Sequence, residues 1–102
     1  MTEQLLLQQQ EQTQQKMSAL LLKIRQENGI KNPFIVTKEL GQSTSTLRNI
    51  EKGLAFPTAK TLNELIKTYA MTIPERNEVL QLKQEMLTIR RNLKALRKAK
   101  AK

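Results

Sequence analysis

The sequence predicts an all-α protein. Apolar residues recur at intervals of three and four in several segments, and no segment shows the alternation that is typical of a strand. Asn, Ser, Thr, Pro and Gly stand where helices would begin or end. The 102 residues allow one small domain with one appended element. We therefore expect four to five helices, the last of them long.

Residues 1–16 are rich in glutamine and are expected to form an N-terminal extension of the domain. Thr2 can cap a helix that begins at Glu3, because a Thr hydroxyl accepts hydrogen bonds from the first free amides of a helix. Nothing apolar lies between Leu7 and Met17, so the segment has no continuous face to bury. Two interpretations stay open: a fraying or disordered segment in solvent, or an arm that binds a protein partner.

The domain itself is predicted over residues 17–73 as four helices. Their core faces are apolar residues at helical spacing: Met17, Leu20, Leu21 and Ile24; Val36 and Leu40; Leu47, Ile50 and Leu54; and Leu62, Leu65, Ile66 and Tyr69. Their boundaries come from capping and helix-ending residues: Asn28-Gly29, Asn32-Pro33, Gly41, Ser43, Gly53 and Thr58.

Residues 74–102 are predicted to form a basic helix that begins at Pro74. Its apolar residues are spaced by three and four, as at the a and d positions of a coiled coil: Val79, Leu82, Met86, Ile89, Leu93 and Leu96. Acidic residues on one flank of this seam and basic residues on the other favour a parallel homodimer. The alternative is a single amphipathic helix that folds back on its own domain.

The net charge of +9 favours a polyanionic partner and is unevenly distributed. Residues 1–30 are neutral overall, residues 31–73 hold six basic and three acidic side chains, and residues 74–102 hold nine basic and three acidic ones. The chain contains no Cys and no His, which removes the commonest nucleophiles, general bases and metal ligands. We expect no catalytic residues, no metal and no cofactor.

No stretch approaches the roughly 18 apolar residues that a membrane-spanning helix needs. The first residues also lack the pattern of a secretory signal. A basic amphipathic helix can bind a membrane surface, but this one has no Trp or Phe anchor. We therefore expect a cytoplasmic protein without a membrane partner.

The segment 33–53 reads PFIVTKELGQSTSTLRNIEKG, a short helix, a turn with Gly and a second short helix. In a helix-turn-helix the second helix enters the major groove of DNA. Together with LLKIRQENG before it and FPTAKTLNELIKTYA after it, the chain resembles the lambda-repressor/Cro-like (XRE) family over about residues 17–70. The resemblance implies a sequence-specific, double-stranded DNA-binding regulator of transcription, a repressor of phage or plasmid type.

The helix over residues 44–52 is the expected recognition helix. With Leu47 and Ile50 turned inward, its outward face carries side chains that can form hydrogen bonds. The candidates for base reading are Thr44, Ser45, Arg48 and Asn49. Arg can bind the O6/N7 edge of guanine and Asn the N6/N7 edge of adenine. Any solvent-exposed face is polar, but the turn, the cap and the family pattern together favour base reading.

The resemblance assigns further roles residue by residue. Candidates for DNA phosphate contact are Asn32, Lys38, Ser43, Lys52 and Lys60. Arg25 and Glu51 match a partly buried ion pair that ties the first helix to the recognition helix. Pro33 and Phe34 depart from the family pattern, because they replace a polar pair that often contacts the DNA backbone.

Two other functions fit the sequence. One is a protein-interaction module, such as an antitoxin or adaptor, that acts through the extension and the C-terminal helix. The other is a DNA-processing accessory factor in conjugation or replication, which would use the same fold without regulating a promoter.

Overall fold

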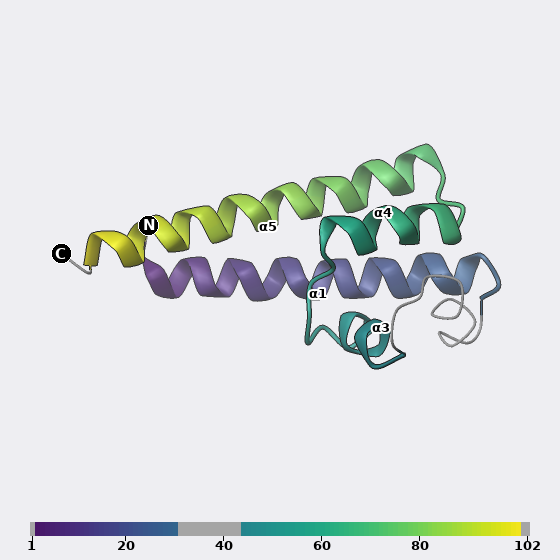
Figure 1. Cartoon of the computed structure of the whole chain (residues 1–102), viewed down its shortest axis with the longest axis horizontal. Coiled ribbons are helices and arrows are strands. Elements are labelled where there is room, and N and C mark those ends of the chain that lie inside the picture. The colour runs from purple at the N-terminus through teal and green to yellow at the C-terminus, as the bar shows by residue number, and fades with distance from the viewer. Residues whose placement is uncertain (1, 31–43, 101–102) are drawn as a thin grey trace.

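The computed structural model describes residues 2–30 and 44–100, and it is all-helical there (Figure 1). The helices are α1 (Glu3–Glu27), α3 (Thr44–Glu51), α4 (Ala59–Thr68) and α5 (Ile73–Lys100). These residues contain no strand, which confirms the predicted all-α class. The helix expected between Pro33 and Gly41, with Val36 and Leu40, lies outside the described residues. Within the described ranges, no helix is both long enough and apolar enough to cross a membrane.

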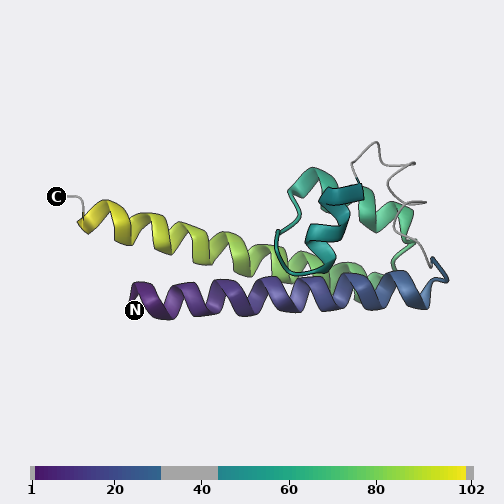
Figure 2. The ribbon, with the colours of Figure 1, turned by 90° about the horizontal axis from the view of Figure 1, so that it is seen from below.

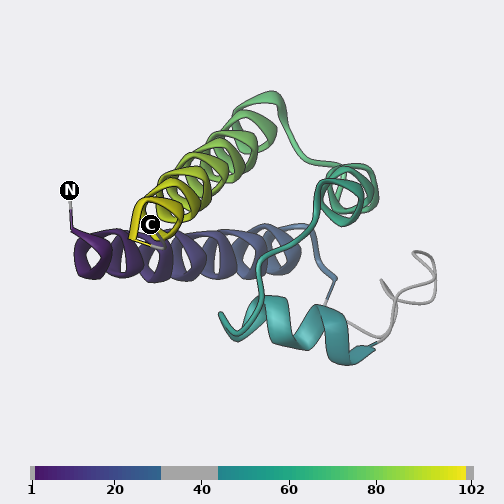
Figure 3. The same cartoon turned by 60° about the vertical axis from the view of Figure 1, so that its left-hand side comes forward.

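The two long helices run side by side in opposite directions along the molecule (Figures 1 and 2). An ion pair joins their outer ends, with 3.3 Å between Arg97 Nε and Glu3 Oε1. The short helices α3 and α4 pack beside the other end of this pair (Figure 3). The long axis of the molecule is therefore set by α1 and α5, and α3 is carried on its side.

The main core lies where all four described helices meet. Its buried members are Met17, Leu21, Ile24, Leu47, Ile50, Leu62, Leu65, Tyr69 and Val79. Leu20 and Ile66 are partly buried against it, so most of the predicted core is confirmed. Leu54 is the exception, since its side chain is 70 % exposed. Helix α3 ends at Glu51 and the chain turns at Gly53, so helical spacing no longer applies to Leu54.

The apolar seam of α5 is buried within one chain. These residues were predicted as a dimer seam: Val79, Leu82, Met86, Ile89, Leu93 and Leu96. The first two pack on the main core, and the last three pack around Leu6 of α1. The structure thus places α5 on its own domain, which is the alternative that the sequence left open, because α1 extends far enough toward its N-terminus to cover these residues. Their assignment to a homodimer seam stays a prediction.

The glutamine-rich segment is the first half of α1, and the helix runs through residue 16 without a break. Thr2 caps it as predicted, because its hydroxyl accepts a hydrogen bond from Leu5 N at 3.2 Å. Leu6 is buried at 2 % exposure and Thr13 at 5 %, which together give this half of α1 a buried face. The interpretation as a disordered tail is therefore wrong. This half of α1 has no continuous apolar face, but the apolar side chains of α5 pack against the one buried leucine that it does have.

The helix boundaries follow local capping rules. Thr58 caps α4 as predicted, and its hydroxyl accepts a hydrogen bond from Thr61 N. Helix α5 begins with a capping box, in which Thr72 Oγ1 accepts from Glu75 N and Glu75 Oε1 accepts from Thr72 N. This box starts α5 at Ile73, one residue before Pro74.

Ala70 ends α4 in a backbone conformation that favours glycine, with φ of 49°. We predict that Ala70→Gly stabilises the protein by about 1 kcal/mol, because an alanine Cβ is strained in the left-handed region. Urea unfolding followed by circular dichroism measures the change. The matched control is Ala95→Gly inside α5, which should lower stability by about 1 kcal/mol. A loss of stability in both variants would contradict the assigned turn.

Candidate nucleic-acid interface

Helix α3 presents one apolar face to the core and one polar face to solvent. Leu47 and Ile50 are each only 3 % exposed, whereas Ser45, Arg48 and Asn49 are exposed. Thr44 is the first residue of the helix, and its side chain lies outside the described part of the structure. The inward and outward faces predicted for the recognition helix are therefore observed for the residues from 45 onward.

Three side chains of α1 hold the last turn of α3. The Ser18 hydroxyl donates a hydrogen bond to the carbonyl oxygen of Glu51. Gln14 Nε2 donates to the carbonyl oxygen of Gly53 at 2.6 Å. Arg25 Nε donates to Glu51 Oε1 at 2.5 Å. The last carbonyls of a helix have no partner within the helix, and the Ser18 contact satisfies one of them. Together the three contacts fix the end of α3 relative to α1.

The ion pair that the resemblance implies between Arg25 and Glu51 is present and shielded from water. The two side chains are 7 % and 9 % exposed. Arg25 Nη1 also donates to the carbonyl oxygen of Ile30 at 2.7 Å, so the guanidinium has two acceptors. Burial, followed by the negative charge of Glu51, raises the pKa of Tyr69 far above its usual value. Tyr69 therefore stays neutral beneath the ion pair.

Gly53 allows the chain to leave α3 while staying close to α1. Its φ is +76°, and the turn is a Schellman motif in which Gly53 N donates to Ile50 O and Leu54 N to Asn49 O. A Cβ at this position would lie 2.7 Å from Gln15 Nε2. Glycine is thus required by the backbone conformation and favoured by the close approach of α1.

The predicted phosphate contacts fall into two groups. Lys52, just after α3, and Lys60, in the first turn of α4, are both exposed. Asn32, Lys38 and Ser43 lie outside the described residues. The structure therefore brings Lys52 to the end of the polar face of α3, and it places Lys60 on α4.

Gln14 and Ser18 contact the end of α3, and the sequence prediction missed them. They lie four residues apart on α1, and Arg25 follows seven residues later, so all three share one side of the helix. The helical spacing of these three residues is a signal that the sequence contains. It was missed because nothing in the sequence distinguishes Gln14 from the six other glutamines of residues 1–16.

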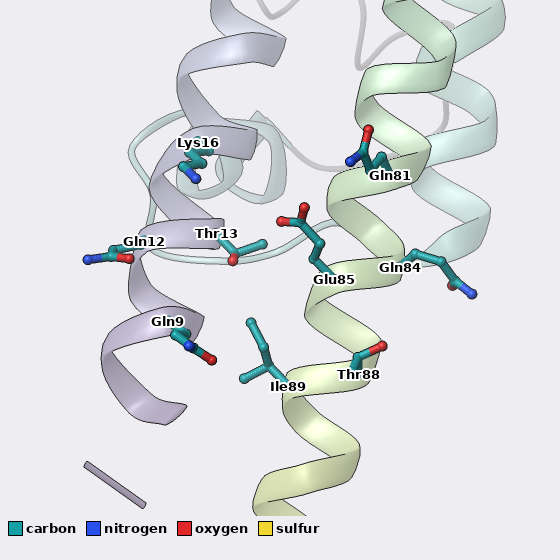
Figure 4. Close-up of a pocket in the computed structure, with 9 residues that line it drawn as sticks. All are labelled: Gln9, Gln12, Thr13, Lys16, Gln81, Gln84, Glu85, Thr88 and Ile89. Atoms are coloured by element: carbon teal, nitrogen blue, oxygen red, sulfur yellow. The ribbon is translucent and has the colours of Figure 1, made fainter. Parts of the chain in front are cut away.

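A polar groove lies between α1 and α5 (Figure 4). Its lining residues are Gln9, Gln12, Thr13, Lys16, Gln81, Gln84, Glu85, Thr88 and Ile89. Glutamine and threonine side chains dominate it, with one lysine and one glutamate. No group of three or more acidic side chains among residues 2–30 and 44–100 is arranged to hold a metal ion.

Comparison with known proteins identifies no family for this chain. No protein-family model, no curated protein and no solved structure matches it. The exposed face of α3 and the residues that hold this helix are therefore the features from which a function can be inferred.

The buried ion pair gives a stability prediction. Arg25→Met and Glu51→Met should each cost about 3–5 kcal/mol, because each leaves one uncompensated buried charge. The double variant should lose clearly less than the sum of the two single losses, because it buries no charge. Urea unfolding of the four proteins forms a double-mutant cycle.

Lys23→Met is the matched control, because Lys23 pairs with Glu27 in solvent, with side chains 70 % and 55 % exposed. Its cost should stay below about 1 kcal/mol. Additive losses for Arg25→Met and Glu51→Met would show that the two charges do not stabilise each other.

Proposed function

We propose that this protein is a sequence-specific, double-stranded DNA-binding regulator of transcription, of repressor type, which reads the major groove with α3. One observation carries the proposal. A short helix is fixed to the core along one face and by its last turn, while its other face offers Ser45, Arg48 and Asn49 to solvent. The major groove is wide enough to admit such a helix.

The electrostatics of α3 support a polyanionic target. Glu51 is the one acidic residue of the helix, and its charge is paired with Arg25. The exposed charges at this site are therefore the positive ones of Arg48 and Lys52. Arg48 and Asn49 are each suited to a bidentate contact with a base, worth about 1–3 kcal/mol of discrimination. Lys52 and Lys60 are suited to phosphates.

The resemblance to phage and plasmid regulators supports a mobile-element setting and a dimer on inverted half-sites. Two recognition helices about 34 Å apart can read one face of a duplex. Because α1 covers the α5 seam within one chain, pairing of two chains through that seam would require α1 to leave it. A selected DNA sequence with inverted half-sites supports this arrangement, whereas a single uninterrupted site supports one chain per duplex.

The base-reading assignment predicts a loss of specificity. A selection from random duplexes first yields the preferred sequence, and fluorescence anisotropy then measures affinity for that duplex and for a random one. Arg48→Ala and Asn49→Ala should each reduce the ratio of the two affinities by about tenfold, through loss of the base contact. Arg91→Ala on α5 is the control and should keep the ratio. An unchanged ratio for Arg48→Ala and Asn49→Ala would exclude α3 as the reading helix.

The phosphate assignment predicts a different result for Lys52. Lys52→Ala should weaken binding to selected and random duplexes alike, because phosphate contacts carry no sequence information. The slope of log K against log salt should fall by about 0.9, the value for one phosphate contact. Lys67→Ala, at another exposed lysine, is the control. A sequence-dependent effect of Lys52→Ala would contradict a pure phosphate role for this residue. If the original protein binds all duplexes without any sequence preference, the result would instead favour an accessory DNA-processing function.

A further inference from the structure

The two edges of the α5 seam carry opposite charges and line different grooves against α1. Glu78 and Glu85 lie on one edge, beside Lys16. Arg90, Lys94 and Arg97 line a separate groove on the other edge, with Leu7, Gln10 and Leu93. No carboxylate is among the described residues that line this second groove, which we call the basic groove.

The side chains of the basic groove are poorly neutralised. Arg97 pairs with Glu3, yet its side chain remains 63 % exposed. Arg90 and Lys94 are exposed, and Arg90 lies over the Phe56 ring with 5.7 Å from its Cζ to the ring centroid. An aromatic face attracts a cation without cancelling its charge. The groove is therefore a site of positive potential.

A further cation lies beside the groove at the α3–α4 connection. Lys83 Nζ lies 5.3 Å from the centroid of the Phe56 ring and donates to the carbonyl oxygen of Pro57 at 2.8 Å. Burial, followed by the positive charge of Arg90, lowers the pKa of Lys83. Two cations thus share one aromatic ring, and an anion placed near them would relieve their repulsion.

The basic groove lies on the same side of α1 as the end of α3. Gln10 lines the groove, and Gln14, one helical turn later, donates to the carbonyl oxygen of Gly53. Phe56, over which Arg90 lies, follows Gly53 by three residues, so the basic groove and the end of α3 meet at the α3–α4 connection. A polyanion that binds α3 and extends past this connection therefore meets positive charge on α5.

We propose that Arg90 and Lys94 form a second nucleic-acid contact, which binds the phosphate backbone of the duplex beside the segment read by α3. This inference rests on the proposed function. The contact is to phosphate because Arg90 and Lys94 lie on α5, away from the helix that would enter the major groove, and both cations can bind phosphate oxygens. It adds affinity and salt dependence to DNA binding and leaves the sequence preference to α3.

Two variants of equal charge test the proposal. Arg90→Gln with Lys94→Gln removes two cations from the basic groove. Arg91→Gln with Lys98→Gln removes one arginine and one lysine from the same helix, at exposed positions that do not line the groove. All four side chains are exposed, so both variants should keep the circular dichroism spectrum of the original protein.

The measurement is affinity across a salt series, on a long duplex that contains the selected sequence and on a duplex trimmed to that sequence alone. On the long duplex, the groove variant should lower the slope of log K against log salt by about 1.8, for two phosphate contacts. The Arg91/Lys98 variant should lower it clearly less. On the trimmed duplex, the two variants should behave alike.

Each contrary result has a distinct meaning. Equal slopes for the two variants on the long duplex would overturn the second contact, even if Arg48 still governs specificity. If the original chain binds all duplexes equally but the groove variant alone loses salt dependence, the proposed reading function fails and the groove contact stands. If the groove variant keeps full DNA affinity and instead loses binding to mixed phosphatidylcholine–phosphatidylserine vesicles, the groove is a membrane-surface site and the proposal is wrong.

Discussion

The buried junction between α1 and the last turn of α3 determines what the molecule can present to a partner. Arg25 pairs with Glu51 at a site largely shielded from water, and Ser18 and Gln14 donate to the carbonyl oxygens of Glu51 and Gly53 at the end of α3. A helix of eight residues is too short to be stable alone, so its position and its existence both depend on this junction. The same ion pair removes the negative charge of Glu51 from the outer face, which leaves that face positive.

Helical spacing predicted much of this architecture from the sequence. The core positions of α1, α3 and α4, the caps at Thr2 and Thr58, and the inward face of α3 all follow from local rules, because each depends on neighbours within a few residues. The ion pair between Arg25 and Glu51 joins distant segments, and it was anticipated by resemblance to a family and not by periodicity. The base-reading and phosphate roles stay predictions.

The sequence did not predict which helix covers the apolar seam of α5. The a and d pattern of α5 is compatible with a second α5 or with α1, since an apolar seam does not specify its partner. Leu6 and Thr13 are the buried side chains in the glutamine-rich half of α1, and Leu6 packs on the seam against Ile89 and Leu93. The same docking separates the charges of α5 into an acidic edge and the basic groove.

The proposed function requires that the outward face of α3 contacts duplex DNA. The most direct measurement is a titration of nitrogen-15-labelled protein with the selected duplex, followed by chemical shifts of the backbone amides and of the Asn49 side-chain amide. We expect the largest changes at Ser45, Arg48 and Asn49, with no comparable change in the polar groove around Gln9 and Gln81. Changes concentrated in that polar groove, with α3 unaffected, would contradict it.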